Sequence, residues 1–223
     1  AANKNKIKIV NTPYILGKYV ADYILGIILS NQRKIIEYNY TFKLQQSWNK
    51  EPGRSLFNKT VGFIGFGNIG TEFAKLVKPF ECNTIFYDPN VNSNQNSSQV
   101  DLKKLFKDSD ILILAAQLNN ETRNIVNKNN LKLLKNNSLL INVSRGPLVN
   151  EEDLFEAINN NELNYVFLDV FCNEPPYLED YYVDNHNINF SQHNASNSQE
   201  AIKEVNFKVI EILKEELQKW ILF

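Results

Sequence analysis

Arg145, Glu174 and His193 have side chains suited to acid–base chemistry on an anionic compound, and each stands in a polar loop after an apolar run. Arginine can hold a carboxylate in a bidentate grip and polarise an adjacent carbonyl. An imidazole, with a reference pKa of about 6.5, can give or take a proton near neutral pH. A neighbouring carboxylate favours the imidazolium and fixes its tautomer. Together the three predict proton transfer on a bound carboxylate-bearing compound.

A glycine-rich segment, Gly65-Phe-Gly-Asn-Ile-Gly70, has the spacing of a loop that cradles a diphosphate. It directly follows an apolar run and opens a helical pattern, as such a loop requires. Gly65 permits the tight turn, Gly67 lets the backbone approach the diphosphate, and Gly70 lets the helix pack close to the strand. The diphosphate would then lie on free N–H groups at the positive end of the helix dipole.

Asp88 ends the next apolar run, eighteen residues beyond Gly70. That is close to the separation of about 20 expected for the acid that binds the adenosine ribose hydroxyls. No Lys or Arg follows before Lys103, so a 2′-phosphate would meet Asp88 without a nearby cation. NAD is therefore favoured over NADP. The alternative is a simple glycine turn followed by a solvated loop aspartate.

Each polar residue also has an explanation that involves no chemistry. Arg145 could cap a surface turn, Glu174 could be a solvated loop acid, and His193 could be structural. His186 lies in a polar run and is interpreted as surface. Asp169 differs, because a carboxylate at the end of an apolar strand is unfavourable without a partner, and we expect it to face the cofactor. The predicted cofactor-binding residues are Gly65, Gly67, Asn68, Ile69, Gly70, Asp88, Val143 and Asp169.

The elements that must position these residues alternate between short apolar strands and helices. This alternation predicts an α/β fold, a Rossmann-type doubly wound parallel sheet covered on both faces. The expected strands are Val61–Gly65, Thr84–Tyr87, Ile111–Ala115, Leu139–Val143, Tyr165–Val170 and Ile188–Phe190, and the expected helices are Thr71–Val77, Asp101–Phe106, Asn129–Leu134, Glu151–Asn159 and Ser198–Leu217. Because groups beyond the carboxyl ends of parallel strands converge, we expect the three loops to meet at one edge of the sheet.

An N-terminal helical arm precedes the glycine loop. Apolar residues recur at helical spacing between Ile15 and Ile28, in a stripe wide enough to pack on two sides, and one interpretation is a subunit contact on the second side. An ordinary core helix is the alternative. We expect three segments: an N-terminal strand and arm helix in residues 1–55, the dinucleotide-binding domain in 56–195, and a C-terminal helix in 196–223.

Composition excludes several classes of protein. The 223 residues carry a formal net charge of -1, which argues against a nucleic-acid surface or a polybasic membrane anchor. Cys82 and Cys172 cannot build a disulfide framework or a four-thiolate zinc site, so no metal is predicted and a reducing, cytoplasmic setting is expected. The most apolar stretch, Tyr19–Leu29, is shorter than the roughly 20 residues of a membrane span.

These residues, in this order, resemble the D-isomer-specific 2-hydroxyacid dehydrogenase family along nearly the whole chain. The similarity is carried by Val20-Ala-Asp22, Trp48, Lys59 to Gly70, Tyr87-Asp-Pro89, Ser109-Asp110, Leu118 to Thr122, Asn142 to Gly146, Leu168 to Phe171, Glu174-Pro175 and His193. The resemblance implies that Arg145 binds the substrate carboxylate and carbonyl, and that His193 is the acid/base paired with Glu174. It implies that Asp169 contacts the nicotinamide end of NAD, and it implies a homodimer joined through the cofactor domains.

The sequence also departs from that family. Its first lobe, which forms the opposite wall of the cleft and selects the substrate, has no counterpart in the chain, and the C-terminal helix would return toward it. Gln192 stands where proline usually precedes the histidine. The leading hypothesis is hydride transfer between NAD(H) and a small 2-oxo/2-hydroxy acid. The alternative is an NAD(H)-binding dimeric regulatory or co-repressor-like module with vestigial catalysis. Glu174 disfavours a formate-dehydrogenase-like enzyme, in which this partner would be an amide.

Overall fold

The protein is described from a computed structural model. It describes residues 2–5, 7–46, 48, 50–92, 94–163, 165–176 and 188–221.

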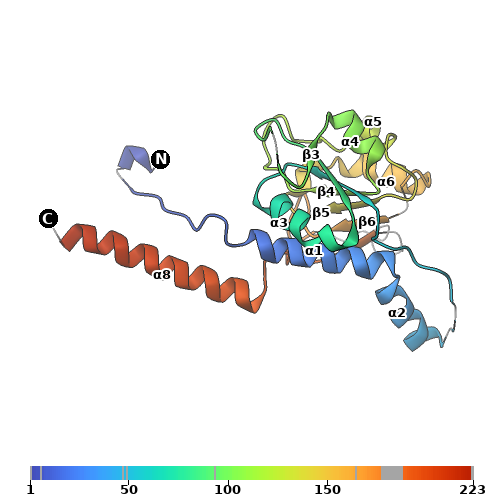
Figure 1. Cartoon of the computed structure of the whole chain (residues 1–223), viewed down its shortest axis with the longest axis horizontal. Helices are drawn as coiled ribbons and strands as arrows, with labels where there is room; N and C mark the ends of the chain where they lie inside the picture. The colour runs from blue at the N-terminus through green and yellow to red at the C-terminus, as the bar shows by residue number, and fades with distance from the viewer. Residues whose placement is uncertain are drawn as a thin grey trace.

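One sheet of seven parallel strands organises the molecule, in the order β3-β2-β1-β4-β5-β6-β7 (Figure 1). The strands are β1 (Thr60–Ile64), β2 (Asn83–Tyr87), β3 (Ser98–Gln99), β4 (Ile111–Leu114), β5 (Leu139–Asn142), β6 (Tyr165–Leu168) and β7 (Ile188–Phe190). The chain moves outward from β1 to β3 and then crosses back to β4, which places a switch point between β1 and β4. The predicted Rossmann-type parallel sheet is confirmed.

Helices cover both faces of this sheet. The helices of the described residues are η1 (Asn3–Asn5), α1 (Gly17–Gln32), α2 (Ile35–Gln45), α3 (Asn68–Leu76), η2 (Lys78–Phe80), α4 (Leu102–Asp108), α5 (Lys128–Leu131), η3 (Gly146–Leu148), α6 (Glu151–Asn159) and α8 (Gln199–Ile221), of which η1, α2 and α8 do not cover the sheet. All four residues of β4 and all four of β5 are buried. This is why both strands read as continuous apolar runs rather than as alternating ones.

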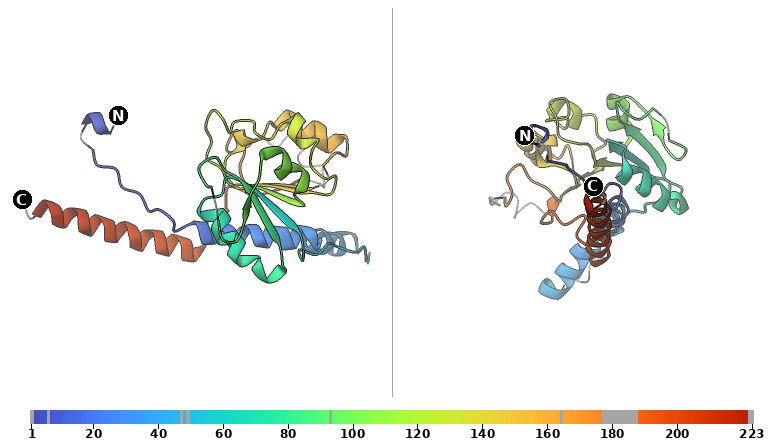
Figure 2. Two further views of the ribbon diagram at one scale, coloured as in Figure 1. Left: turned by 45° about the horizontal axis from the view of Figure 1, so that its top comes forward. Right: turned by 90° about the vertical axis from the view of Figure 1, so that its left-hand side faces the viewer.

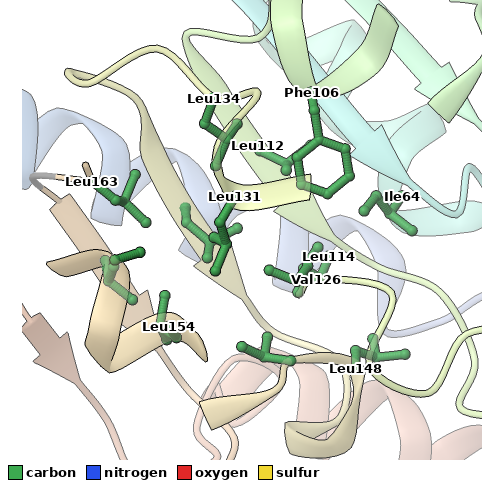
Figure 3. Packing of buried hydrophobic residues seen from close by; sticks show 14 of the residues in the cluster. Ile64, Phe106, Leu112, Leu114, Val126, Leu131, Leu134, Leu148, Leu154 and Leu163 are labelled. Carbon is green, nitrogen blue, oxygen red and sulfur yellow. The ribbon is translucent and has the colours of Figure 1, made fainter. Parts of the chain in front are cut away.

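The first core lies between the sheet and helices α4, α5 and α6 (Figure 3). Leu112 and Leu114 of β4 point into it and meet Phe106 from α4 and Leu131 from α5. Leu154 closes the layer from α6. Figure 3 shows these side chains converging from separate elements, so this half of the domain depends on long-range packing.

The second core lies on the opposite face, beneath α1 and α3. Ile24 and Ile28 of α1 are fully buried against Phe63 and Ile113 of the sheet and Phe73 of α3. The helix lies along the underside of the sheet (Figure 1). Packing inside the chain therefore accounts for most of the wide apolar stripe of α1. This agrees with the alternative that the arm is an ordinary core helix.

Helices α2 and α8 and the N-terminal segment extend away from this body (Figure 2). The expected N-terminal strand is wrong for the described part of residues 1–55. Ile7 and Ile9 are 58% and 74% exposed, and among the described residues no strand precedes β1. Helix α2, which the sequence analysis did not predict, contains no buried residue. Among the described residues, no helix is both long and apolar enough to cross a membrane.

Candidate active site

The glycine loop between β1 and α3 has the backbone that a diphosphate cradle requires. Gly65 has a φ of +82°, a region that side chains disfavour. A Cβ on Gly65 would also lie 2.5 Å from the Cα of Ala116, in the loop that follows β4. The Gly65 N–H donates to the Tyr87 carbonyl at 2.9 Å, which ties the loop to the end of β2. The sequence prediction of a tight turn at Gly65 agrees with this geometry.

The start of α3 is open to a ligand. A Cβ on Gly67 would meet nothing within 4 Å, so the backbone there is accessible from outside. No side chain of the described residues caps the helix, whose first turn contains Asn68 and Ile69. The Asn68 side chain donates to the Tyr14 carbonyl at 2.8 Å instead. Gly70 packs against the Phe66 ring, where a Cβ would lie 2.6 Å from a ring carbon. Uncapped N–H groups at a helix start are suited to holding an anion.

Asp88 stands beside this loop at the end of β2. One carboxylate oxygen accepts from the Phe66 N–H at 2.8 Å, and the other accepts from the Asn90 N–H at 2.8 Å. The first bond joins the acid to the glycine loop, so the two predicted parts of a dinucleotide site lie together. The side chain remains partly exposed. An uncapped helix start beside a carboxylate fits a dinucleotide whose adenosine ribose carries no 2′-phosphate.

Arg145 and Gly146 begin the loop that follows β5. The Arg145 side chain is exposed, and its guanidinium donates to the Ser144 carbonyl at 2.6 Å. A Cβ on Gly146 would lie 2.0 Å from the carbonyl carbon of Phe171. Only a residue without a side chain allows the two backbones to approach so closely. Gly146 therefore brings the arginine loop against the segment that carries Glu174. Val143, the remaining predicted residue of this loop, is buried at the end of β5.

His193 and Glu174 form a direct pair. The imidazole Nδ1 lies 2.8 Å from one Glu174 carboxylate oxygen. The other oxygen accepts from the Phe171 N–H at 3.1 Å, which holds the carboxylate in place. Both side chains are partly exposed, 46% for His193 and 39% for Glu174, so they are accessible to a substrate. The structure brings these two predicted residues together from the loops after β6 and β7.

The charge environment joins Arg145 to the pair. The hydrogen bond with His193 lowers the pKa of Glu174, burial opposes this effect, and the Phe171 N–H lowers the pKa further. The electrostatic interactions with His193 and Arg145 act in the same lowering direction. Glu174 is therefore ionised at neutral pH and acts as a hydrogen-bond acceptor for the imidazole. The sequence prediction that the three loops meet at one edge of the sheet agrees with this arrangement.

Asp169 lies where the sequence analysis placed it, directly after β6. The residue is completely buried. Its carboxylate accepts hydrogen bonds from the Ser191 hydroxyl and from the N–H groups of Asn194 and Ala195. These partners of the carboxylate lie in the neighbouring loop, and its contact with the cofactor stays a prediction. Ser191 was not singled out from the sequence; its position two residues before His193 is the only signal.

Two further observations bound the site. His186 lies outside the described residues, and within those residues no group of three His, Cys, Asp or Glu side chains could hold a metal ion. A cavity of about 350 Å³ opens at the opposite edge of the sheet, lined by Arg54, Lys59, Asp110 and Lys135 among others. Lys59 and Asp110 immediately precede β1 and β4, so this cavity is separate from the candidate active site.

Comparison with known proteins decides the family. The sequence profile of the D-isomer specific 2-hydroxyacid dehydrogenase NAD-binding domain matches residues 25–195, which include the glycine loop and all three catalytic candidates. The chain belongs to the D-isomer-specific 2-hydroxyacid dehydrogenase family. Its matched region is the NAD-binding domain, and the cofactor of that domain is NAD.

Members of this dehydrogenase family are similar to the chain over most of its length. A hydroxypyruvate reductase of Thermotoga maritima is 33% identical over 221 residues, which are 97% of this chain and 72% of the relative. A glyoxylate reductase of Thermococcus litoralis is 34% identical over 192 residues, which are 80% of this chain and 58% of the relative. The chain thus corresponds to part of the length of these dehydrogenases.

Solved structures of the dehydrogenase fold agree. An acyclic imino acid reductase in complex with NADPH and D-Arg has a TM-score of 0.89 and 26% identity, covering 98% of this chain and 71% of that one. A glyoxylate reductase from Paecilomyes thermophila has a TM-score of 0.86 and 25% identity, covering 98% of this chain and 67% of that one. The fold and the family assignment are consistent.

Proposed function

We propose that this domain serves an NAD-dependent oxidoreductase that interconverts a small 2-oxo acid and the corresponding D-2-hydroxy acid. The observation that carries the proposal is the pair of His193 Nδ1 and the Glu174 carboxylate, 2.8 Å apart, with the Arg145 loop packed against the segment that leads to Glu174. A cation, an ionised acid and an imidazole at the carboxyl ends of neighbouring strands are the groups that such a reaction needs.

Each side chain has a separate task in this proposal. The Arg145 guanidinium binds the substrate carboxylate through two parallel hydrogen bonds and polarises the adjacent carbonyl. His193 donates a proton from Nε2 to the carbonyl oxygen during reduction and removes it from the hydroxyl during oxidation. Glu174 accepts from Nδ1, fixes the tautomer and stabilises the imidazolium. The bound NAD(H) supplies or accepts the hydride at the substrate C2.

The glycine loop and Asp88 support NAD rather than NADP. The uncapped start of α3 would hold the diphosphate, and the Asp88 carboxylate would accept from the adenosine ribose hydroxyls. A 2′-phosphate next to this carboxylate would be repelled, since like charges disfavour each other. Asp169 supports the histidine loop from the interior of the domain.

The proposed roles are tested with His193→Ala. We expect NADH affinity, measured by nucleotide fluorescence, to stay near that of the unchanged protein, while turnover of 2-oxo acids falls by a factor of about 10² to 10⁴, the usual contribution of a general acid. The assay uses glyoxylate, hydroxypyruvate and pyruvate with both the 223-residue chain and its full-length gene product. Equal loss of affinity and turnover would contradict the acid/base role.

Arg145→Lys provides a second, sharper comparison. The ammonium keeps the charge but cannot form two parallel hydrogen bonds, so we expect turnover to fall while NADH binding persists. If the unchanged full-length protein binds NADH tightly but reduces none of the acids tested, the alternative of an NAD(H)-responsive regulatory module replaces the enzyme.

We further propose that two parts of the chain meet other protein surfaces. Helix α2 presents large apolar side chains that are more than half exposed, Ile35, Ile36, Tyr40, Phe42 and Leu44, and we assign it to a homodimer contact between cofactor domains. Helix α8 extends from the body and exposes Ile202, Phe207, Leu213 and Leu217. We assign α8 to packing against a substrate-binding lobe.

A further inference from the structure

Four hydrogen bonds tie the loop of residues 191–195 to one buried residue, Asp169. The carboxylate accepts from the Ser191 hydroxyl before His193 and from the N–H groups of Asn194 (2.7 Å) and Ala195 (2.9 Å) after it. The Asp169 carbonyl accepts from the N–H of His193 itself at 2.7 Å. One residue therefore fixes both sides of the histidine.

The carboxylate has little other means of stabilisation. Asp169 is fully buried, and no cation of the described residues forms an ion pair with it. A buried carboxylate is tolerated when several donors satisfy its oxygens. The bonds to the loop are those donors, so releasing the loop would leave the charge unsatisfied. Carboxylate and loop are thus mutually dependent.

Helix α1 reaches the same network through Tyr23. Its ring packs edge-on against Phe167 of β6, with centroids 6.3 Å apart. Burial raises the pKa of Tyr23, and an interaction with the Ser191 hydroxyl opposes this increase. The electrostatic interaction with Asp169 raises the pKa of Tyr23 further. The Tyr23 ring therefore joins helix α1 to the strand that ends beside Asp169.

We propose that Asp169, Ser191 and Tyr23 are positioning residues that hold the His193 imidazole against Glu174, and that helix α1 takes part through Tyr23. This inference rests on the proposed function for its importance to turnover, but its geometry stands without it. The backbone of His193 supports it, since its φ of 52° lies in a region that non-glycine residues rarely adopt and that surrounding contacts must maintain.

The test measures the pairing directly by NMR in the 223-residue chain. Two signals report it: the imidazole Nδ1–H proton of His193 and the ¹³C titration of the Glu174 carboxyl group, assigned with His193→Ala and Glu174→Gln. Asp169→Asn could prevent folding, so Ser191→Ala and Tyr23→Phe carry the test. Both remove one hydroxyl and leave the carboxylate and its backbone donors in place. Thermal unfolding confirms that each variant is folded.

We expect the Nδ1–H signal to be lost or weakened in Ser191→Ala, and the pKa of Glu174 to rise toward its ordinary value of about 4.3. Tyr23→Phe should act in the same direction and less strongly. Ser191→Thr, which keeps the hydroxyl, should restore both signals. Tyr19→Phe is the matched control, because this phenol lies on the same helix but bonds to Glu204 at 2.6 Å.

Unchanged signals in Ser191→Ala would overturn the positioning role of the network. Unchanged signals in Tyr23→Phe alone would overturn the part assigned to α1. Neither readout requires turnover or NADH. A protein that fails to reduce any 2-oxo acid but shows the expected NMR changes would therefore refute the proposed function and leave this inference intact.

Discussion

At the scale of single residues, the position of His193 is set by its backbone as much as by its side chain. Its N–H, and the N–H groups of the two residues that follow, all donate to Asp169. The ring therefore meets Glu174 from a fixed loop rather than from a mobile one. Fixing the loop before the substrate arrives reduces the entropy lost on reaching the reactive geometry.

The catalytic candidates could be predicted from the sequence, whereas the contacts of Asp169 could not. Arg145, Glu174 and His193 are polar residues in loops after apolar strands, and the convergence of parallel strand ends is a general rule. The partners of Asp169 are mainly backbone N–H groups about 25 residues further along the chain. Backbone groups are the same for nearly every residue type, so such a contact leaves no mark on the sequence.

Cys172, next to the candidate site, should be slow to alkylate. Burial, followed by the charge of Glu151, raises the pKa of its thiol to about 11. Since only the thiolate reacts, iodoacetamide labelling at pH 8 should be roughly 10²-fold slower than for a thiol of ordinary pKa, about 8.5. The rate should keep increasing up to about pH 11. Peptide mass spectrometry separates this site from Cys82.

Glu151→Gln is the control for this prediction. Removing the charge leaves only burial to raise the pKa of the Cys172 thiol, so labelling at pH 8 should become faster. A labelling rate at pH 8 that already matches a free cysteine would show that the thiol is not perturbed.

At the scale of elements, the strands were predicted closely and α2 and β3 were missed. Continuous apolar runs bounded by polar residues locate buried strands, and this signal is strong for β4 and β5. From residue 35 to residue 44 the apolar side chains recur mainly at every second position, which does not match helical spacing. A helix without a buried face carries no helical pattern. β3 has only two residues, Ser98 and Gln99, too few for a period.

The Asp110 side chain joins the starts of β4 and β1 and should contribute to stability in a pH-dependent way. It accepts from the N–H of Thr60 at 2.9 Å and from Lys135 at 2.8 Å. Burial raises the pKa of Asp110, but these two hydrogen bonds and the charges of Lys135 and Lys59 together hold the value below the ordinary one. We expect Asp110→Asn to lower the free energy of unfolding at pH 7 by about 1 kcal/mol, measured by urea denaturation.

The sign of the pH effect follows from the lowered pKa. The stabilisation is complete above the unfolded-state pKa of about 3.9 and is lost as the pH falls through the lower folded value. The difference between Asp110→Asn and the unchanged protein should therefore shrink below about pH 3. Asp108→Asn is the matched control, because its pair with Lys104 is an exposed contact within one helix turn. An equal effect of both variants would show that the junction of strand starts contributes nothing.

At the scale of the whole molecule, the exposed apolar side chains of α2 predict self-association. Ile36→Lys and Leu44→Lys place charges on α2 where the native side chains are 65% and 67% exposed. Each should raise the dimer dissociation constant by at least 10-fold in sedimentation velocity, because an unpaired charge in an apolar contact is unfavourable. Thermal stability of the monomer should change little, since α2 buries no residue in the chain.

Leu217→Lys on α8 is the comparison for this experiment. That side chain is similarly exposed, at 61%, but lies on the helix assigned to a different contact. If α2 forms the dimer contact, only the α2 variants dissociate the dimer. A monomeric unchanged protein, or dissociation by Leu217→Lys alone, would contradict the assignment.

The packing of α1 beneath the sheet has a consequence for synthesis on the ribosome. Ile24 is completed early, yet its buried neighbours include Ile113 and Ile141, more than a hundred residues later in the case of Ile141. During this interval the apolar side of the helix is exposed to water. Nascent chains of this protein therefore expose an apolar surface on α1 until β5 has been translated and can cover it. We expect molecular chaperones to bind this helix during synthesis.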